Sequence, residues 1–233
     1  MNTDQPVAVV TGARRGIGRH LAEHFLAKGW RVFGSARHES DLSHPAYVHV
    51  CGDVGSEPDV RTLFDSVRQA GRLDALINNA GVAAMNHALL TPVSVMESLM
   101  RTNYVGAFLC CREAARAMQR NDGGRIVNFT SVAVPLALAG EAAYAASKSA
   151  VETLTRVLAR ELATYNVTVN AIGPTPVATD LIAGVPSVKI EHIVARQAIQ
   201  RMGTIADVIN VIDFFISPAS NFITGQVLYL GGM

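Results

Sequence analysis

The sequence predicts an α/β fold, a single doubly wound parallel sheet of about seven strands with helices on both faces. Short apolar runs of the kind found in buried parallel strands alternate with amphipathic stretches of helical length. The first apolar run leads into a glycine-rich turn and then a helical stretch. The 233 residues suit one α/β domain spanning 1–233, with no repeat or linker between parts.

Composition and net charge suit a packed α/β protein and give no reason to expect a nucleic-acid or membrane partner. Hydrophobic residues make up 49% of the chain and aromatic residues 6%, which suits a packed α/β core. A net charge of +1 gives no electrostatic reason to expect nucleic acid or an anionic membrane as a partner. The apolar run VINVIDFFI is short and holds Asn210 and Asp213, so no membrane span is expected. The start lacks a signal peptide, and the three cysteines lack disulfide or zinc spacing, which predicts a reduced, cytoplasmic location.

The first predicted strand, residues 6–10, is followed by a candidate phosphate-binding loop and a helical run at 20–28. Gly12 allows a tight turn, Gly16 lets the backbone approach a diphosphate, and Gly18 lets the helix pack closely on the strand. The amino end of the helix would supply free N–H groups to the phosphates. The glycine spacing differs from the commonest fingerprint, so a purely structural turn is the alternative. The candidate cofactor residues here are Thr11, Gly12, Arg15, Gly16, Ile17 and Gly18.

The same helix contains the string His20-Leu21-Ala22-Glu23-His24, which matches an H-x-x-E-H zinc pattern. Because this helix is already expected to pack behind a phosphate loop, we predict that its outer face binds no metal.

The second predicted strand, 31–36, ends at Arg37 rather than at a carboxylate. An acidic residue at this point usually binds the ribose hydroxyl of NAD, whereas arginine suits the 2′-phosphate of NADP. Arg37 and Arg15 together could bind that phosphate, which favours NADP(H) over NAD(H). The alternative is that both are solvated surface arginines. The third strand, 47–53, ends at Asp53, which could accept from an adenine amino group, with Val54 beside the ring.

The remaining elements follow from apolar runs and helical periodicity. Helices are predicted at 57–70, 101–119, 144–164 and 206–216. Strands are predicted at 73–77, 125–129, 167–172 and 226–230. The strand at 73–77 runs into the small, polar segment Asn78-Asn79-Ala80-Gly81, as a strand end near a cofactor requires.

Candidate chemistry lies around the helix at 144–164. Tyr144 and Lys148 are four residues apart and share one helix face. An ammonium about 4 Å from the phenol would stabilise its anion by up to roughly 4 kcal/mol, lowering the phenol pKa by about three units. Ser131 follows the fifth strand, and the fold could bring its hydroxyl beside the phenol. Taken alone, the pair could equally be a chance spacing in a helix.

Together these residues resemble the short-chain dehydrogenase/reductase family, in its single-domain form. The resemblance covers essentially the whole chain and depends on the order and spacing of several motifs. They are Thr11-Gly12-(x)3-Gly16-Ile17-Gly18, Asn78-Asn79-Ala80-Gly81, Asn103, Ser131, Tyr144-(x)3-Lys148 and Pro174 to Thr179.

The resemblance implies a Rossmann-type fold and a role for each catalytic residue. Tyr144 would be the general acid/base, Lys148 its pKa-lowering partner and ribose ligand, and Ser131 the group that holds the substrate carbonyl. Asn103 would support a water relay behind the lysine, although from the sequence alone a capping or core amide is preferred. Asn79, Ala80 and Gly81 would belong to the cofactor site, whereas Asn78 would hold strands together.

The resemblance also implies a loop around the nicotinamide carboxamide, with Pro174, Val177 and Thr179 as cofactor residues. Thr175 departs from the glycine usual after this proline, which raises a question about the local backbone. Residues 180–200 would form a substrate lid, with plain core packing as the alternative reading. Their apolar side chains, which favour a hydrophobic or neutral ketone, are Leu181, Ile182, Val185, Val188, Ile190 and Ile193.

The function expected is hydride transfer between NADPH and a ketone or secondary alcohol. One alternative is a 3-oxoacyl-acyl-carrier-protein (or acyl-CoA) reductase of fatty-acid metabolism. Asp122 and Tyr165 argue against it, because they stand where those enzymes resemble each other in keeping basic residues. A non-catalytic NADP-sensing protein is the other alternative. The apolar helices at 101–119 and 144–164 suggest a homo-oligomer, a tetramer or else a dimer.

Overall fold

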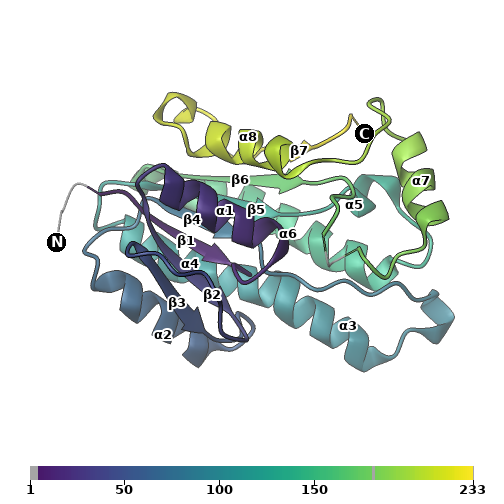
Figure 1. The fold of residues 1–233 in the computed structure, drawn as a ribbon, viewed down its shortest axis with the longest axis horizontal. Helices are drawn as coiled ribbons and strands as arrows, with labels where there is room; N and C mark the ends of the chain where they lie inside the picture. The colour runs from purple at the N-terminus through teal and green to yellow at the C-terminus, as the bar shows by residue number, and fades with distance from the viewer. Residues whose placement is uncertain (1–4, 180–181, 233) are drawn as a thin grey trace.

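The computed structural model describes residues 5–179 and 182–232. Their strands form one seven-stranded parallel sheet in the order β3-β2-β1-β4-β5-β6-β7 (Figure 1). The strands are β1 Val7–Thr11, β2 Arg31–Ala36, β3 Tyr47–Cys51, β4 Ala75–Asn78, β5 Gly124–Phe129, β6 Val167–Gly173 and β7 Val227–Tyr229. The predicted doubly wound fold is confirmed. Strand order reverses between β1 and β4, and such a switch point opens a crevice at the carboxyl ends of the strands.

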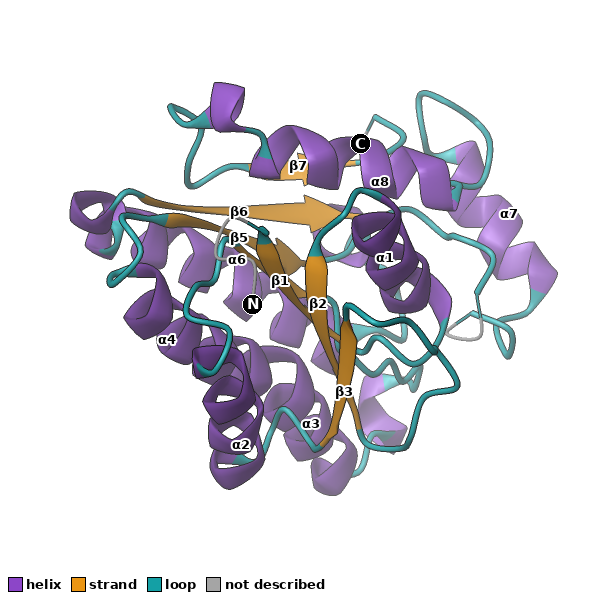
Figure 2. Ribbon diagram, turned by 60° about the vertical axis from the view of Figure 1, so that its left-hand side comes forward, coloured by secondary structure: helices purple, strands orange, loops and turns teal. Residues whose placement is uncertain are grey.

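Helices cover both faces of the sheet (Figure 2). Helices α1 and α8 pack on one face, and α2, α4 and α6 pack on the other. The helices are α1 Gly16–Ala27, α2 Glu57–Arg68, α3 Val93–Leu99, a π-helix Met100–Val105, α4 Gly106–Met118, α5 Ala133–Leu136, α6 Ala142–Glu161, α7 Ser187–Ala195 and α8 Ile205–Ile216. Short 3₁₀ turns lie at Ala88–Leu90, Ala163–Tyr165 and Pro218–Ser220.

The strands are apolar on both sides because each face contributes to a separate core. Val9 of β1 packs into the core beneath α2 and α4, whereas the next residue, Val10, packs into the core beneath α1 and α8. Phe64 is buried in the first core and Phe25 in the second. Each buried phenylalanine contributes roughly 1.5–3 kcal/mol to stability.

The predicted helix at 101–119 is interrupted in the structure. Residues Met100–Val105 form a π-helix that continues from α3 and leads into α4. The helix α3 was not predicted. The fourth strand begins at Ala75 rather than at residue 73, and the Asp74 carboxylate just before it accepts a hydrogen bond of 2.8 Å from the backbone N–H of Val7.

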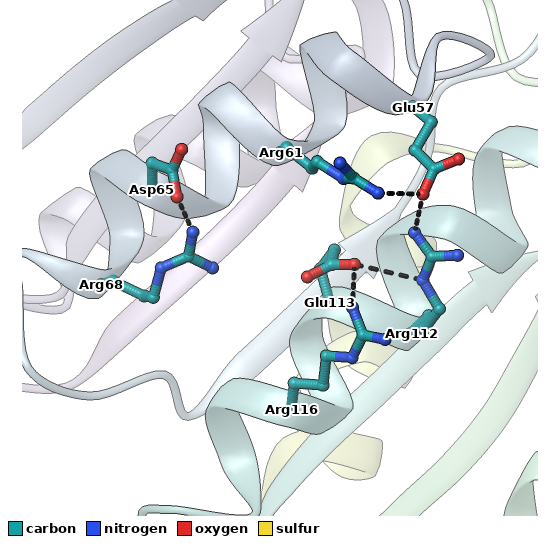
Figure 3. Close-up of polar contacts among 7 residues, drawn as sticks. All are labelled: Glu57, Arg61, Asp65, Arg68, Arg112, Glu113 and Arg116. Carbon is teal, nitrogen blue, oxygen red and sulfur yellow. Dashed lines mark hydrogen bonds and ion pairs between the residues drawn. The ribbon is translucent and has the colours of Figure 1, made fainter.

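Ion pairs fasten α2 to α4 on one face of the sheet (Figure 3). The Glu57 carboxylate accepts from Arg61 of its own helix at 2.8 Å and from Arg112 of α4 at 2.7 Å. Arg112 also reaches Glu113 at 3.1 Å, and Arg116 reaches the same carboxylate at 2.8 Å. Since Glu113 is only 5% exposed, these pairs keep its buried charge compensated.

Candidate active site

The glycine loop after β1 has the backbone that a diphosphate requires. Gly12 and Gly16 have φ of +68° and +57°, in the left-handed region where glycine carries no Cβ penalty. A Cβ at Gly18 would overlap the carbonyl oxygen of Gly12, so only glycine lets α1 start this close to the loop. Helix α1 has no side-chain hydrogen bond at its amino cap, which leaves its first N–H groups available to an anion.

A cleft of about 410 Å³ runs from this loop across the carboxyl ends of β1 to β4. Arg15 and Arg37 both line it, as the sequence predicts, and both are exposed. Asp53 and Val54 also line it, and Asp53 is oriented by a 2.8 Å hydrogen bond that its Oδ1 accepts from the Gly55 N–H. The other predicted cofactor residues on its walls are Gly12, Gly16, Ile17, Asn79, Ala80, Gly81 and Thr179.

Thr11 and Gly18 lie beneath the cleft rather than on its wall. The buried Thr11 hydroxyl accepts from the Ala80 N–H at 3.0 Å, which joins the ends of β1 and β4. Asn79 reinforces this link by donating to the carbonyl of Thr11 at 2.9 Å, while also lining the cleft. As predicted, Asn78 serves the sheet instead, since it donates to Asn128 of β5 at 2.9 Å.

Sequence reasoning missed several residues on the cleft wall. Arg14, Ser35, His38 and Thr102 line it as well. Arg14 donates to the Glu39 carbonyl at 3.0 Å and so braces the segment after β2. A signal was present, because Arg14 is adjacent to Arg15 in a loop already assigned to phosphate binding.

Three of the four predicted catalytic side chains, Ser131, Tyr144 and Lys148, line a second cavity of about 160 Å³. Ser131 follows β5, while Tyr144 and Lys148 lie one turn apart on α6. The cavity is continuous with the cofactor cleft, since both are lined by Ile17, Asn79, Gly81, Val82 and Thr179. The fold therefore brings these predicted residues together beside the cofactor cleft.

Burial, rather than attraction between the two groups, determines the pKa shifts of Tyr144 and Lys148, contrary to the expectation from the sequence. Burial raises the pKa of Tyr144 to about 12, opposed by a hydrogen bond with Ser131. Burial also lowers the pKa of Lys148 to about 8. The phenol pKa thus shifts in the direction opposite to the predicted fall. The ammonium lies 6.0 Å from the Tyr144 ring centroid and donates to the Phe129 carbonyl at 2.9 Å.

Asn103 lies in the π-helix, a distortion that often marks functional positions. Its Oδ1 accepts from the Val82 N–H at 2.9 Å, and its Nδ2 donates to the Val82 carbonyl at 3.0 Å and to Ser147 at 2.9 Å. These bonds make it a core amide that ties the segment after β4 to α6, the reading preferred from sequence alone. A Cβ at Gly81 would lie 3.2 Å from its Oδ1 and 3.3 Å from the Lys148 ammonium, so Asn103 and Lys148 both lie close to this glycine.

Glu152, which sequence reasoning missed, continues the face of α6 that carries Tyr144 and Lys148. It is 5% exposed and accepts hydrogen bonds from Thr130 at 2.8 Å and from Tyr229. A carboxylate four residues after Lys148 on a buried helix face was the available signal. Glu152 thus fixes α6 against the residues that follow β5 and against β7.

The loop after β6 does not need the glycine that was expected where Thr175 stands. Thr175 is not among the described residues with positive φ, so the position does not require glycine. Its buried hydroxyl donates to Gln197, which follows α7. The loop is also fastened by a 2.9 Å bond from the Gly203 N–H to the Pro176 carbonyl.

The expected lid covers the cavity in part. Pro174 and Val177 line the cavity, as do Ile182, Val185, Ile190 and Ile193 from the predicted lid. Val188 instead is 70% exposed, and Leu181 lies outside the described residues. The lining is mostly apolar, with Glu141 and Lys148 as its charged members among the described residues.

The H-x-x-E-H residues of α1 each have another partner. His24 lies 3.0 Å from Asp213, Glu23 accepts from Arg19 at 2.7 Å, and His20 lies 2.8 Å from the Gly16 carbonyl. Across the described ranges 5–179 and 182–232, no helix is both long enough and apolar enough to cross a membrane.

The fold, the glycine loop and the joined cavities define a nucleotide-dependent oxidoreductase site, and comparison with known proteins agrees. Residues 12–232 match the family described as Enoyl-(Acyl carrier protein) reductase. The chain belongs to the short-chain dehydrogenase/reductase family and is an oxidoreductase.

Relatives extend over nearly the whole chain. A short-chain type dehydrogenase/reductase of Picea abies is 36% identical, covering 97% of this chain and 91% of that protein. NADPH-dependent aldehyde reductase 2 of Arabidopsis thaliana, chloroplastic, is 32% identical over 97% of this chain and 92% of its own. The 3-oxoacyl-[acyl-carrier-protein] reductase FabG of Escherichia coli is 30% identical over 100% of this chain and 98% of its own.

Solved structures show the same arrangement. ElxO with NADP bound superposes with a TM-score of 0.89 at 28% identity, covering 97% of both chains. Aldohexose dehydrogenase of Thermoplasma acidophilum, in ligand-free form, gives a TM-score of 0.88 at 28% identity, covering 99% of this chain and 94% of that one.

Proposed function

We propose that this protein is an NADP(H)-dependent carbonyl reductase, reversible as an alcohol dehydrogenase, with Tyr144 as general acid/base. One observation carries the proposal: Ser131, Tyr144 and Lys148 line a mostly apolar cavity that opens into the glycine-loop cleft. The lining favours a hydrophobic ketone or aldehyde, with residues 180–200 as its lid.

The cleft suits an NADP molecule, which when bound supplies or accepts the hydride. Gly12, Gly16 and the amino end of α1 would hold its diphosphate. Arg15 and Arg37 would bind the 2′-phosphate, supported by the NADPH dependence named for the Arabidopsis relative and by NADP in the ElxO structure. Asp53 and Val54 would contact the adenine, and Pro174, Val177 and Thr179 the nicotinamide end.

Each of the proposed catalytic side chains would have its own role in the reaction. The Ser131 hydroxyl would hold the substrate carbonyl, and Tyr144 would give its proton to the carbonyl oxygen. Lys148 would replenish that proton, with Asn103 supporting a water relay behind the lysine. The bond from Lys148 to the Phe129 carbonyl and the bond from Asn103 to Ser147 keep both groups in place before substrate arrives.

The proposal is tested by following oxidation of NADPH and of NADH with a panel of bulky hydrophobic ketones, aldehydes and acetoacetyl-CoA. We expect turnover on bulky carbonyls and a preference for NADPH. A preference for NADH would contradict the role given to Arg15 and Arg37. Saturable NADPH binding with no turnover on any carbonyl would favour the NADP-sensing alternative.

A 3-oxoacyl-acyl-carrier-protein reductase is the second candidate, because FabG proteins match the entire chain at 30% identity. Asp122 and Tyr165 are both exposed. They stand at positions where binding of an acidic acyl carrier protein would need basic residues. Turnover confined to acetoacetyl-CoA would move this candidate ahead of a general carbonyl reductase.

We further propose a homo-oligomer, a tetramer or else a dimer, formed through the outer faces of α4 and α6. Phe108 of α4 is 38% exposed, and Val157 and Tyr165 at the side of α6 are 45% and 42% exposed. A cytoplasmic location also remains a prediction, since the Arabidopsis relatives carry the word chloroplastic in their names.

A further inference from the structure

One charged side chain of the substrate cavity has no role in the reaction proposed above. Glu141 lines this cavity, as do the predicted catalytic residues Ser131, Tyr144 and Lys148. Glu141 precedes Tyr144 by three residues and Lys148 by seven, so the three lie along one face of α6. Burial raises the pKa of Tyr144, and the negative charge of Glu141 raises it further. The carboxylate is therefore close enough to act on the catalytic phenol.

The Glu141 carboxylate accepts no hydrogen bond from the described residues. Glu141 is the amino-cap residue of α6, where a side-chain oxygen often accepts from the first N–H groups, but its own side chain makes no such bond. The described side-chain atoms that are both buried and without a partner belong to Asn78, Asn121, Arg125 and Thr168. The oxygens of the half-buried Glu141 therefore keep accessible surface, and a ligand in the cavity can reach them.

The charge of Glu141 has distant compensation, whereas its oxygens lack donors. Burial raises the pKa of Glu141, and attraction to Lys189 of α7 opposes that rise. The exposed Lys189 ammonium donates to the Met85 sulfur at 2.8 Å and, within the described part of the chain, forms no ion pair with Glu141. The Lys148 ammonium lies farther along the same face of α6. With two ammonium groups already nearby, a neutral donor suits this carboxylate better than a third cation.

A substrate that fills the cavity removes water from this carboxylate. The cavity measures about 160 Å³, and apolar side chains such as Leu138 and Ile190 line most of it. These side chains offer no donor in place of the displaced water, so a substrate without a donor leaves a charged acceptor desolvated and unpaired. A substrate that carries its own donor avoids this cost. Sites of this kind strongly reject analogues that lack the donor.

We propose that Glu141 is a specificity-determining residue that accepts a hydrogen bond from a substrate hydroxyl, and that the substrate is a hydroxyketone or hydroxyaldehyde with an otherwise apolar body. This inference rests on the carbonyl reductase function proposed above. The carbonyl carbon takes the hydride of NADPH and the carbonyl oxygen takes the Tyr144 proton, so the product is a diol. The hydroxyl bound by Glu141 is not transformed. Because roughly 5 Å of helix separates Glu141 from Tyr144, this hydroxyl lies about two to four carbons from the carbonyl.

Matched ketones test the proposal. Methyl ketones with a hydroxyl two, three or four carbons from the carbonyl are each compared with their methyl ether and with the unsubstituted ketone. Calorimetric titration onto the full-length protein saturated with NADP⁺ gives the affinity without reduction of the carbonyl, and NADPH oxidation gives kcat/KM. We expect at least one hydroxyketone to exceed its methyl ether by about tenfold or more in both measurements, since a hydrogen bond to a charged acceptor is gained.

Variants of Glu141 separate a contact with substrate from a structural role. Glu141→Leu should weaken the preferred hydroxyketone about tenfold or more, while the unsubstituted ketone binds as well as in wild type or better. Glu141→Gln keeps an acceptor oxygen and should retain part of the preference. Equal losses for all ketones would indicate a structural role and contradict the proposal. Glu97→Leu, at an exposed position on α3 that lines neither cavity, is the control and should keep the full preference.

The two measurements also distinguish failure of this inference from failure of the proposed function. Equal affinities of wild type for each hydroxyketone and its ether, or a preference that survives in Glu141→Leu, would overturn the role of Glu141 even if ketones are reduced. A Glu141-dependent preference in the NADP⁺ complex with no reduction of any carbonyl would support the hydroxyl contact and overturn the reductase function. Absence of carbonyl binding to that complex would overturn both.

Discussion

Tyr144 and Lys148 titrate as buried groups, in opposite directions for one reason. Desolvation disfavours the phenolate and the ammonium alike, which raises the first pKa and lowers the second. The attraction between them does not dominate, because the ammonium turns toward the Phe129 carbonyl. At neutral pH the phenol is therefore neutral and the lysine mostly protonated, which are the forms that the proposed carbonyl reduction would use.

Replacing Lys148 by methionine should change the pH dependence of stability. The lysine pKa falls from 10.5 unfolded to about 8 folded, so the unfolded chain binds more protons between those values. The destabilisation from Lys148 is complete below pH 8 and declines as pH rises toward 10.5. Lys148→Met should thus be more stable than wild type at neutral pH, by at most about 3 kcal/mol at 1.36 kcal/mol per pKa unit.

Urea unfolding of both proteins at several pH values provides the measurement. The stability difference should shrink steadily as pH increases above 8. A difference that stays constant with pH would show that Lys148 is not held in a desolvating environment.

The role proposed for Arg37 predicts how its replacement changes the affinity for NADPH and for NADH. Arg37→Gln should weaken NADPH by about tenfold or more and leave NADH nearly unchanged, because only NADPH carries the 2′-phosphate. Fluorescence titration with both cofactors measures this, with Arg31→Gln, at the start of β2 and away from the cleft, as the control. Equal losses for both cofactors would contradict a 2′-phosphate contact.

At the scale of elements, the loop after β6 depends on a side chain from another segment. Thr175→Val should leave the buried Gln197 oxygen without its donor and destabilise the protein by about 1–3 kcal/mol. Thermal unfolding measures this, and the exposed Thr153→Val on α6 is the matched control. If both variants have the same melting temperature, the Thr175–Gln197 hydrogen bond does not stabilise the loop.

Elements with strong local patterns were predictable, and those shaped by distant contacts were not. The β1–loop–α1 unit follows from an apolar run and three glycines, and α6 follows from its periodicity. The π-helix at Met100–Val105 does not, because the Asn103 amide bonds to Val82 and Ser147, far away in sequence. The bond between Thr175 and Gln197 is hidden from sequence reasoning for the same reason.

For the whole molecule, the outer faces of α4 and α6 carry the proposed assembly. Phe108→Glu would place a charge on the half-exposed apolar surface where Phe108 and Tyr165 line the same hollow. It should shift a tetramer or dimer toward smaller species in light scattering after gel filtration. Phe222→Glu, at a side chain that is 98% exposed, is the control and should leave the mass unchanged. A wild-type protein that elutes as a monomer would contradict the assembly.

The sheet and the active site were predictable at this scale because parallel strands place their carboxyl ends at one edge, so residues following β1, β4, β5 and β6 had to meet there.

The most direct test of the central claim is the Tyr144→Phe protein, assayed for NADPH-dependent carbonyl reduction and for NADPH binding. The variant keeps the ring and loses only the hydroxyl that is proposed to donate the proton. We predict a fall in kcat of about a hundredfold to ten-thousandfold with NADPH affinity retained. Reduction that continues near the wild-type rate would contradict the assignment of Tyr144 as the general acid/base.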